Sequence, residues 1–201
     1  MPRKRGEAEF IEKRSRFIGY CLPVTAEAEA LAFIKEIRAK HRDASHNVYA
    51  WKIREGALCR HSDDGEPSGT AGMPLLDVFL KQDVTNFCAV ATRYFGGVLL
   101  GAGGLTRAYS KCGVVGLEAA GIAVMRPMTL GRILLPYALY DIVLRALEGA
   151  GASGIEPLFE TDVTLRFALP DEDFQPFCET LTEITAGRAA AEREGGAFSA
   201  T

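Results

Sequence analysis

Four segments in the first half of the chain have patterns of apolar residues that predict β-strands, three by alternation and one by a continuous apolar run. Residues 7–22 alternate loosely and predict two strands around Ser15. Residues 46–53 alternate as in a half-buried strand, and residues 57–61 predict another strand before a turn at Asp64-Gly65. Residues 87–95 are almost continuously apolar, which predicts a central strand covered on both faces.

Helical spacing of apolar residues appears three times between these strands. The first helix has Thr25 as a candidate N-cap and runs to about Ile37. A second helix is predicted over 72–82, where Pro74 is tolerated only near the first turn. A third follows a glycine-rich segment and covers about 105–119. Strands and helices together predict a mixed α/β unit.

The second half has a simpler rhythm. A strand at 132–135 leads to a helix over 140–147, and two further strands follow. A helix capped by Asp171 and a last short strand at 189–194 complete the order βαββαβ. This order is that of a ferredoxin-like split βαβ unit. The predicted fold class is therefore α+β with two domains.

Charge is divided unequally between the two halves. Residues 1–130 hold 18 Lys and Arg against 14 Asp and Glu, whereas residues 131–201 hold 5 against 12. We therefore expect domains at 1–128 and 129–201, with any anionic partner on the first and a basic protein partner on the acidic second.

Several classes of protein do not fit the composition. No apolar stretch approaches the roughly 20 residues of a membrane helix, and no secretory signal follows the basic start, so we expect a cytosolic protein. The five cysteines are widely spaced, which indicates neither a disulfide framework nor a zinc site. Cys88 and Cys112 lie in apolar stretches and are expected to be buried thiols.

The most specific segment is the glycine-rich run between the apolar strand and the third helix. Its backbone N–H groups and the helix N-terminus favour an anion, and nearby basic residues would form a rim beside it. It is neither a Walker A loop nor a dinucleotide fingerprint. The alternative is a tight crossover that needs glycine for packing. The candidate anion- or nucleic-acid-binding residues are Arg93, Tyr94, Gly96, Gly97, Gly101, Gly103, Gly104, Thr106, Arg107, Ser110 and Lys111.

A second polar segment precedes the 72–82 helix. It contains His61, Asp63, Asp64, Glu66, Ser68 and Thr70. These side chains could bind a hard cation or supply a general base, with His61, Asp63 and Asp64 as the weak catalytic candidates. The alternative is an Asx turn followed by a helix cap from Ser68 or Thr70. A single histidine and a spacing unlike an EF-hand argue against a metal, and no cofactor motif is present.

Three other residues invite a functional interpretation. His41 and His46 flank a short loop and are expected to be surface or capping residues. Trp51 belongs to an alternating strand, so we expect it in the core rather than as a platform for stacked bases.

These segments resemble the signature of the IMPACT/YigZ family over about residues 7–125. The resemblance is carried by the runs Ser15-Arg16-Phe17-Ile18, His46-Asn47-Val48-Tyr49-Ala50, Asp63 to Gly72, Gly72-Met73-Pro74-Leu75-Leu76 and Arg93 to Gly101. The resemblance implies a ribosomal-protein-S-five domain-two-like fold for the first domain, as in domain IV of elongation factor G. It also implies a ferredoxin-like second domain and no catalytic residue set. Eukaryotic members regulate translation in the amino-acid-starvation pathway.

Three functional hypotheses follow. The leading one is a non-catalytic protein that binds RNA or the ribosome through Arg93, the 96–104 loop, Arg107 and Lys111, and regulates translation. The first alternative is a phosphate- or nucleotide-binding enzyme that uses the glycine-rich loop, or a hydrolase built on His61 and its neighbouring aspartates. The second is a protein-interaction module in which the acidic second domain docks a basic partner.

Overall fold

The computed structural model of the protein describes residues 1–200. Internal contacts divide the chain into two compact units, Met1–Ala123 and Val124–Thr201. The boundary expected from composition, after residue 128, lies inside a long strand, β6 (Met125–Leu135). The predicted α+β fold class with two domains is confirmed.

The first unit contains a five-stranded antiparallel sheet in the order β1-β2-β5-β3-β4. Its strands are β1 (Gly6–Glu12), β2 (Ser15–Pro23), β3 (His46–Ile53), β4 (Leu58–Ser62) and β5 (Phe87–Tyr94). A short 3₁₀ turn, Glu55–Ala57, connects β3 to β4. The apolar β5 is central and buried along nearly its whole length, as its composition predicts.

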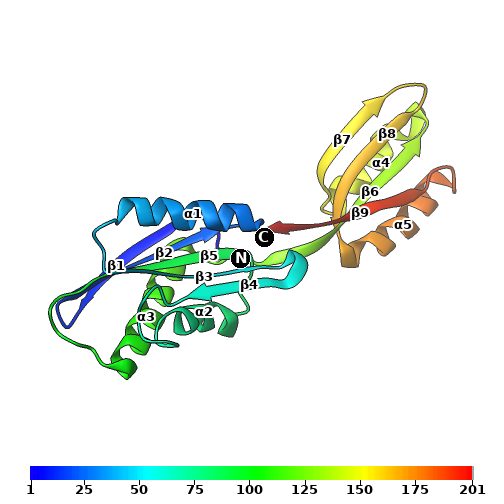
Figure 1. The fold of residues 1–201 in the computed structure, drawn as a ribbon. Helices are drawn as coiled ribbons and strands as arrows, with labels where there is room; N and C mark the ends of the chain where they lie inside the picture. The colour runs from blue at the N-terminus through cyan, green and yellow to red at the C-terminus, as the bar shows by residue number, and fades with distance from the viewer. Residues whose placement is uncertain (201) are drawn as a thin grey trace. The chain divides into compact units, whose positions relative to one another are not determined.

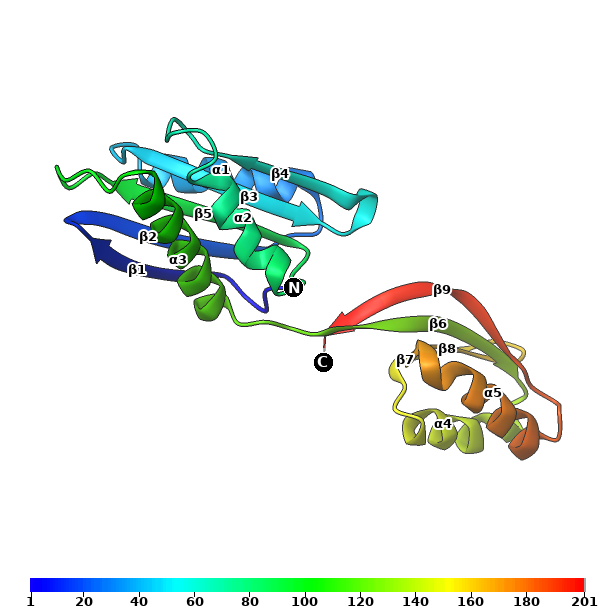
Figure 2. The same ribbon diagram turned by 90° about the horizontal axis from the view of Figure 1, so that it is seen from below.

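Helices cover both faces of this sheet. α1 (Glu27–Lys40) lies on one face, and α2 (Gly72–Lys81) and α3 (Ala102–Ala120) lie on the other (Figures 1 and 2). Each layer has its own apolar core. Trp51 belongs to the core under α1 with 1% of its surface exposed, which confirms that it is not a stacking platform.

The start of α1 differs from the sequence-based prediction. The N-cap position is Ala26, not Thr25. Glu29, one turn into the helix, instead accepts a hydrogen bond from the Thr25 backbone N–H at 2.7 Å. The Glu29 side chain thus folds back over the N-terminus of α1, as the glutamate of a capping box does, and binds a backbone N–H there.

α3 approaches the sheet closely because glycine occupies the contact on β2. A Cβ added to Gly19 would lie 2.3 Å from the carbonyl oxygen of Cys112. The helix backbone therefore rests almost directly on the strand. Since α3 also begins beside the candidate site, this contact fixes where the helix N-terminus lies.

The second unit has a four-stranded antiparallel sheet in the order β7-β8-β6-β9. Its elements after β6 are a 3₁₀ turn (Tyr137–Leu139), α4 (Tyr140–Gly149), β7 (Ser153–Phe159), β8 (Val163–Pro170), α5 (Asp171–Thr185) and β9 (Ala191–Ala200). The first and third strands are central and the second and fourth are at the edges, which confirms the ferredoxin-like βαββαβ prediction. Both β6 and β9 are longer than the sequence predicts.

Asp171 does not cap α5 in the way that the sequence suggests. The N-cap is Pro170, and the carboxylate of Asp171 accepts hydrogen bonds from the Thr129 hydroxyl and from Arg193. It thus ties the start of the helix to β6 and β9. The acidic first turn still complements the helix dipole.

Within residues 1–200, none of the helices is both long enough and apolar enough to cross a membrane.

The contact at Gly19 gives a stability prediction. Gly19→Ala should lower the free energy of unfolding by about 2 kcal/mol, because the new methyl group must displace the backbone of α3. Gly103→Ala, in the first turn of α3, is the matched control, since its Cβ would meet only the end of the Arg107 side chain at 3.5 Å. Urea unfolding of both variants measures the difference, and equal stabilities would contradict the close approach.

Candidate functional site

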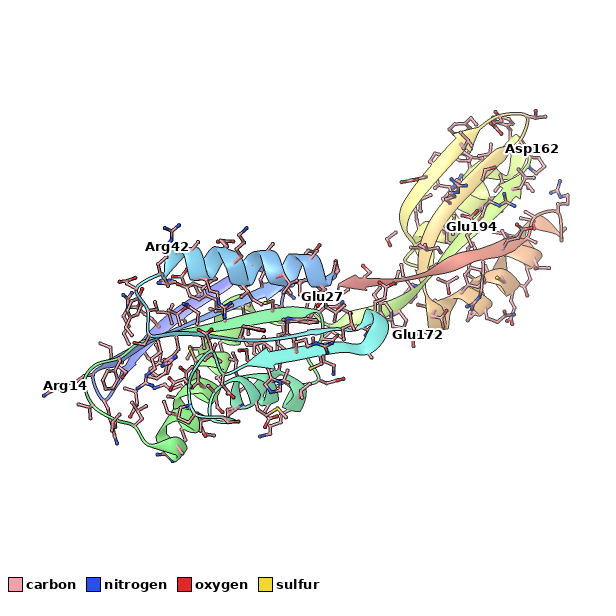
Figure 3. The ribbon with its side chains drawn as sticks, in the orientation of Figure 1. Arg14, Glu27, Arg42, Asp162, Glu172 and Glu194 are labelled. Atoms are coloured by element: carbon pink, nitrogen blue, oxygen red, sulfur yellow. The ribbon has the colours of Figure 1, made fainter. Side chains whose placement is uncertain are left out.

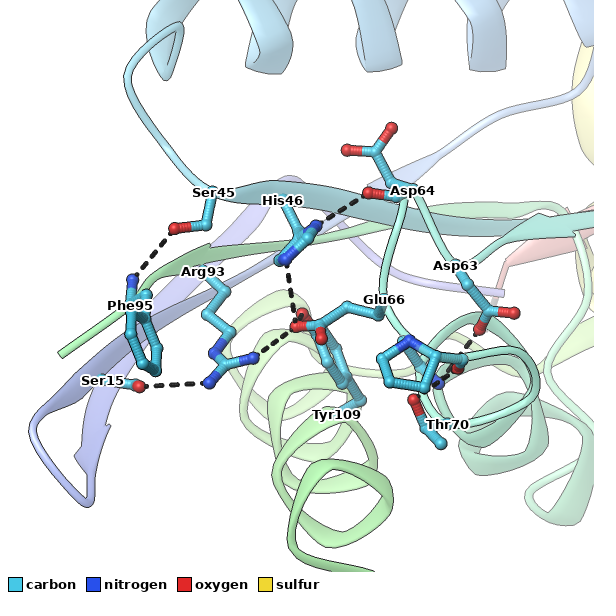
Figure 4. Close-up of polar contacts among 12 residues, drawn as sticks. Ser15, Ser45, His46, Asp63, Asp64, Glu66, Thr70, Arg93, Phe95 and Tyr109 are labelled. Atoms are coloured by element: carbon cyan, nitrogen blue, oxygen red, sulfur yellow. Dashed lines mark hydrogen bonds and ion pairs between the residues drawn. The ribbon is translucent and has the colours of Figure 1, made fainter. Parts of the chain in front are cut away.

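A buried carboxylate, Glu66, connects three elements of the first unit (Figure 4). Its Oε1 accepts hydrogen bonds from Arg93 Nη1 of β5 at 2.6 Å and from the Tyr109 hydroxyl of α3 at 2.7 Å. His46 Nε2, at the start of β3, lies 3.7 Å from the same oxygen. Burial and the bond to Glu66 raise the pKa of Tyr109, so its hydroxyl stays protonated and donates.

The loop that presents Glu66 is held by the two aspartates before it. Asp63 accepts hydrogen bonds from the backbone N–H groups of Gly69, Ala71 and Gly72 at 2.9, 3.1 and 2.8 Å. Although burial opposes its ionisation, these bonds together lower the pKa of Asp63. Asp63, rather than Ser68 or Thr70, therefore satisfies the start of α2.

Asp64 attaches the same loop to β3 and α1. Its carboxylate accepts the backbone N–H of Asn47 at 2.6 Å and pairs with Arg38. Its backbone carbonyl accepts from His46 Nδ1 at 2.8 Å, which directs His46 Nε2 towards Glu66. His46 is therefore a half-buried part of the site and not a surface residue.

These contacts argue against the hydrolase hypothesis, which needs His61 together with Asp63 or Asp64. The carboxylates of Asp63 and Asp64 are both engaged in structural bonds, and His61 is exposed on β4. Within residues 1–200 no group of three His, Cys, Asp or Glu side chains is placed to hold a metal ion. Cys88 and Cys112 are buried, as predicted, and burial raises the pKa of both thiols.

Arg93 does not join an exposed basic rim. Only 5% of its surface is exposed, and its guanidinium lies between the Phe17 and Phe95 rings, with Nη2 3.4 Å from the Ser15 hydroxyl. Its charge is balanced by Glu66, and its buried Nε has no hydrogen-bond partner among residues 1–200. The strand period explains this placement, because Arg93 continues the row of Phe87, Ala89 and Ala91, which packs in the core under α2 and α3.

Tyr94, next along β5, faces the opposite side of the sheet. There its hydroxyl lies 2.7 Å from Nδ1 of His41, whose Nε2 lies 2.6 Å from the Tyr20 hydroxyl. His41 is thus a buried residue at the C-cap of α1, so the expected capping role is confirmed and the expected surface role is wrong. Tyr94 is likewise removed from the candidate anion site.

A pocket of about 410 Å³ opens beside the buried carboxylate. It is lined by His46, Glu66, Pro67, Arg93, Phe95, Leu99, Leu100, Gly101, Ala102 and Leu105. Most of its surface is apolar, and the polar groups come from His46, Glu66 and Arg93. The sequence gives no direct signal of this pocket, since its residues come from four separate segments.

The glycine-rich loop serves two purposes. A Cβ on Gly96 would lie 2.0 Å from the backbone of Arg14, so this glycine allows the β1–β2 turn to pack against the loop, as the crossover alternative requires. Gly97 and Gly101 instead have open space and positive φ values. Gly101 precedes α3 without a side-chain cap, which leaves the first N–H groups of that helix without partners in the described chain.

Arg107 and Lys111 are exposed on the first turns of α3, as predicted. They lie with Lys13 and the acidic residue Glu12 around a small hollow of about 190 Å³. Arg14, labelled in Figure 3, follows Lys13 in the β1–β2 turn. We call Lys13, Arg14, Arg107 and Lys111 the basic surface. None of the four forms an ion pair with any residue of the described range 1–200.

Two neighbours do not share this surface. The Ser110 hydroxyl donates to the Pro74 carbonyl at 3.3 Å, between α2 and α3. The Thr106 hydroxyl donates to the Ala102 carbonyl of its own helix at 3.1 Å. The sequence missed Lys13 and Arg14, because no local pattern shows that the β1–β2 turn meets α3.

Four of the twelve acidic side chains in residues 131–201, Asp171, Glu172, Glu192 and Glu194, form ion pairs within the described residues. Their ion pairs are Arg126–Glu172, Arg132–Glu192, Arg132–Glu194, Arg166–Glu194 and Arg193–Asp171.

Comparisons with known proteins place this arrangement in a family. Residues 13–116 match the family described as "Impact N-terminal domain", and residues 133–188 match the family described as "Domain of unknown function (DUF1949)". The "IMPACT family member YvyE" of Bacillus subtilis is 36% identical over 188 residues, which cover 93% of this chain and 87% of that protein. The chain belongs to the IMPACT family. The resemblance to the IMPACT/YigZ family that the sequence motifs indicate is confirmed.

Other relatives agree with this membership. The "IMPACT family member YigZ" of Escherichia coli is 34% identical over 180 residues, covering 87% of each protein. A solved structure described as a hypothetical protein is 30% identical, with a TM-score of 0.63 over 95% of this chain and 94% of that one. Glu66, the pocket and the basic surface all lie within the matched IMPACT domain.

The buried Glu66–Arg93 pair gives a stability prediction. Glu66→Gln should destabilise the protein by about 3 kcal/mol, because it leaves the Arg93 charge buried without compensation. Glu9→Gln removes an equivalent but exposed partner from Arg16 and should cost no more than about 1 kcal/mol. Denaturant unfolding tests both, and a Glu66 variant as stable as the Glu9 variant would contradict this role.

His41 should make stability depend on pH. Burial, with the nearby charge of Lys40, lowers the pKa of His41 below its ordinary value of 6.5. The unfolded chain then binds a proton that the folded one does not, so this contribution is complete above about pH 6.5 and decreases as the pH falls below it. The free energy of unfolding between pH 7.5 and 5.5 should therefore fall less steeply in His41→Gln than in the wild type. Equal slopes would contradict the assignment.

Proposed function

We propose that this IMPACT family protein binds RNA, free or on the ribosome, through the basic surface and the N-terminus of α3, and regulates translation without catalysis. The observation that carries the proposal is the set of four exposed cations, none of them ion-paired within residues 1–200, beside uncapped helix N–H groups. The implied role of eukaryotic family members in translation supports the regulatory part.

The chemistry of the basic surface suits phosphate. Cations that already have a carboxylate partner gain little from a second anion, but these four have none within residues 1–200. The positive end of the α3 dipole adds to their field. Such contacts position a nucleic-acid backbone and carry no sequence information by themselves.

The other two hypotheses have weaker support. A kinase-like phosphate loop needs a free hydroxyl at the helix start, but the Thr106 hydroxyl is bonded to its own helix. Docking of a basic protein on the acidic unit competes with the arginines that already pair with several of its carboxylates. The cations of the basic surface form no ion pair within the described chain, although Glu12 lines the same hollow.

Co-sedimentation with ribosomes and with bulk RNA tests the proposal. The wild type should bind at low salt and release at high salt, because counterion release dominates phosphate binding. Arg107→Ala/Lys111→Ala should bind more weakly at every salt concentration and lower the log–log salt slope by about 1.4 for single strands.

Arg132→Ala/Arg166→Ala removes the same charge from the second unit and serves as the matched control, since both arginines are paired with glutamates. This control should bind as the wild type does. Salt-independent binding, or equal losses in the two double variants, would sink the proposal.

A further inference from the structure

The pocket beside Glu66 borders the proposed phosphate contacts, because Gly101 and Ala102 at the N-terminus of α3 also line it. It shares Leu100 with the hollow of the basic surface, and both are lined by the first two turns of α3. Whatever occupies the pocket therefore lies next to a hollow lined by Lys13, Arg107 and Lys111, three cations without an ion pair within residues 1–200, and by Glu12. The occupant should be part of an anionic molecule, or be attached to one.

The walls of the pocket suit a flat apolar group. Phe95 and Leu99 line it with 48% and 82% of their surfaces exposed, so both side chains are accessible to a ligand in the pocket. Phe95 offers an accessible aromatic ring, in contrast to the buried Trp51. Such rings stack on bases in single-stranded nucleic acids.

Two polar residues that line the pocket, Arg93 and Glu66, each keep an atom without a hydrogen-bond partner among residues 1–200. Arg93 Nε is buried and has no partner within residues 1–200. Glu66 makes all its side-chain contacts through Oε1, so Oε2 accepts no hydrogen bond from the described residues. A buried donor without a partner is costly, which points to a ligand that completes it.

We propose that this pocket receives an unstacked nucleobase of single-stranded RNA, an inference that rests on the proposed RNA binding. A base has apolar faces for Phe95 and Leu99, and an edge that both donates and accepts for Glu66 and Arg93. A simple carboxylate or phosphate fits less well, because Glu66 already balances the charge of Arg93. The phosphates that flank the base then lie towards the α3 N-terminus and the basic surface.

Binding of a single-stranded oligonucleotide and of a blunt duplex of the same sequence tests this inference. The single strand carries 2-aminopurine, whose fluorescence reports whether a base leaves the stack. Phe95→Ala/Leu99→Ser should weaken single-strand binding about tenfold and reduce the fluorescence change, since base–aromatic stacking contributes on this scale. Duplex binding and the salt slope should stay at wild-type values.

Two controls separate the pocket from the basic surface. Arg107→Ala/Lys111→Ala should weaken single-strand and duplex binding alike. A single strand with abasic positions has no base for the pocket. Its affinity for the wild type should therefore equal the affinity of the intact single strand for Phe95→Ala/Leu99→Ser. Both pocket side chains are exposed, so the variant is expected to fold, and circular dichroism is the measurement that checks it.

The outcomes are distinguishable. Equal affinity for single strand and duplex, unchanged in the pocket variant, overturns the base pocket and leaves RNA binding intact. Failure to bind either RNA overturns the proposed function and this inference with it. If the pocket variant keeps its RNA affinity but loses self-association in sedimentation velocity, the pocket belongs to a second copy of the chain and the inference is wrong.

Discussion

Glu66 places a negative charge inside the first unit, and the surrounding structure is arranged to compensate it. A buried carboxylate without partners would cost several kcal/mol, whereas this one meets a guanidinium and a phenol at hydrogen-bond distance. The partners come from β5 and α3, and the carboxylate itself from the loop before α2. Each of these elements must therefore hold its position for the charge to be tolerated. Glu66 and Arg93 also line the pocket, so the same contacts hold this part of the pocket in place.

The loop reaches this position because its first two aspartates are anchored before Glu66 turns inward. Asp63 binds the backbone at the start of α2, and Asp64 binds the backbone of β3. Three successive acidic side chains thus have three different partners, although the sequence alone makes them look equivalent. Such a loop is ordered by hydrogen bonds rather than by an apolar core or a metal.

The sequence predicted most elements and the two-domain α+β class, because strand and helix periods depend on local burial. It failed where a residue's partner is distant in the chain. The charge of Arg93 favours a place on the surface. The strand period, however, places Arg93 in the same buried row as Phe87, Ala89 and Ala91, and Tyr94 on the other face of the sheet. Lys13 gave no local signal at all. Its proximity to Lys111 follows from the pairing of β1 with β2 and from the packing of α3 on both, which are long-range contacts.

The N-terminus of α3 separates two surfaces with different physics. On one side, unpaired cations gain from any phosphate backbone, so their contribution is broad, long-ranged and weakened by salt. On the other side, the Glu66–Arg93 ion pair has no net charge and lies among apolar side chains. It attracts nothing over a long range and stabilises only a group that fits the pocket and completes its hydrogen bonds. A protein with the first surface alone would bind all nucleic acids alike. In the proposed function, the second surface lies beside the first, so an RNA strand bound by its phosphates could place an unstacked base in the pocket, and the protein would then prefer single strands to duplexes.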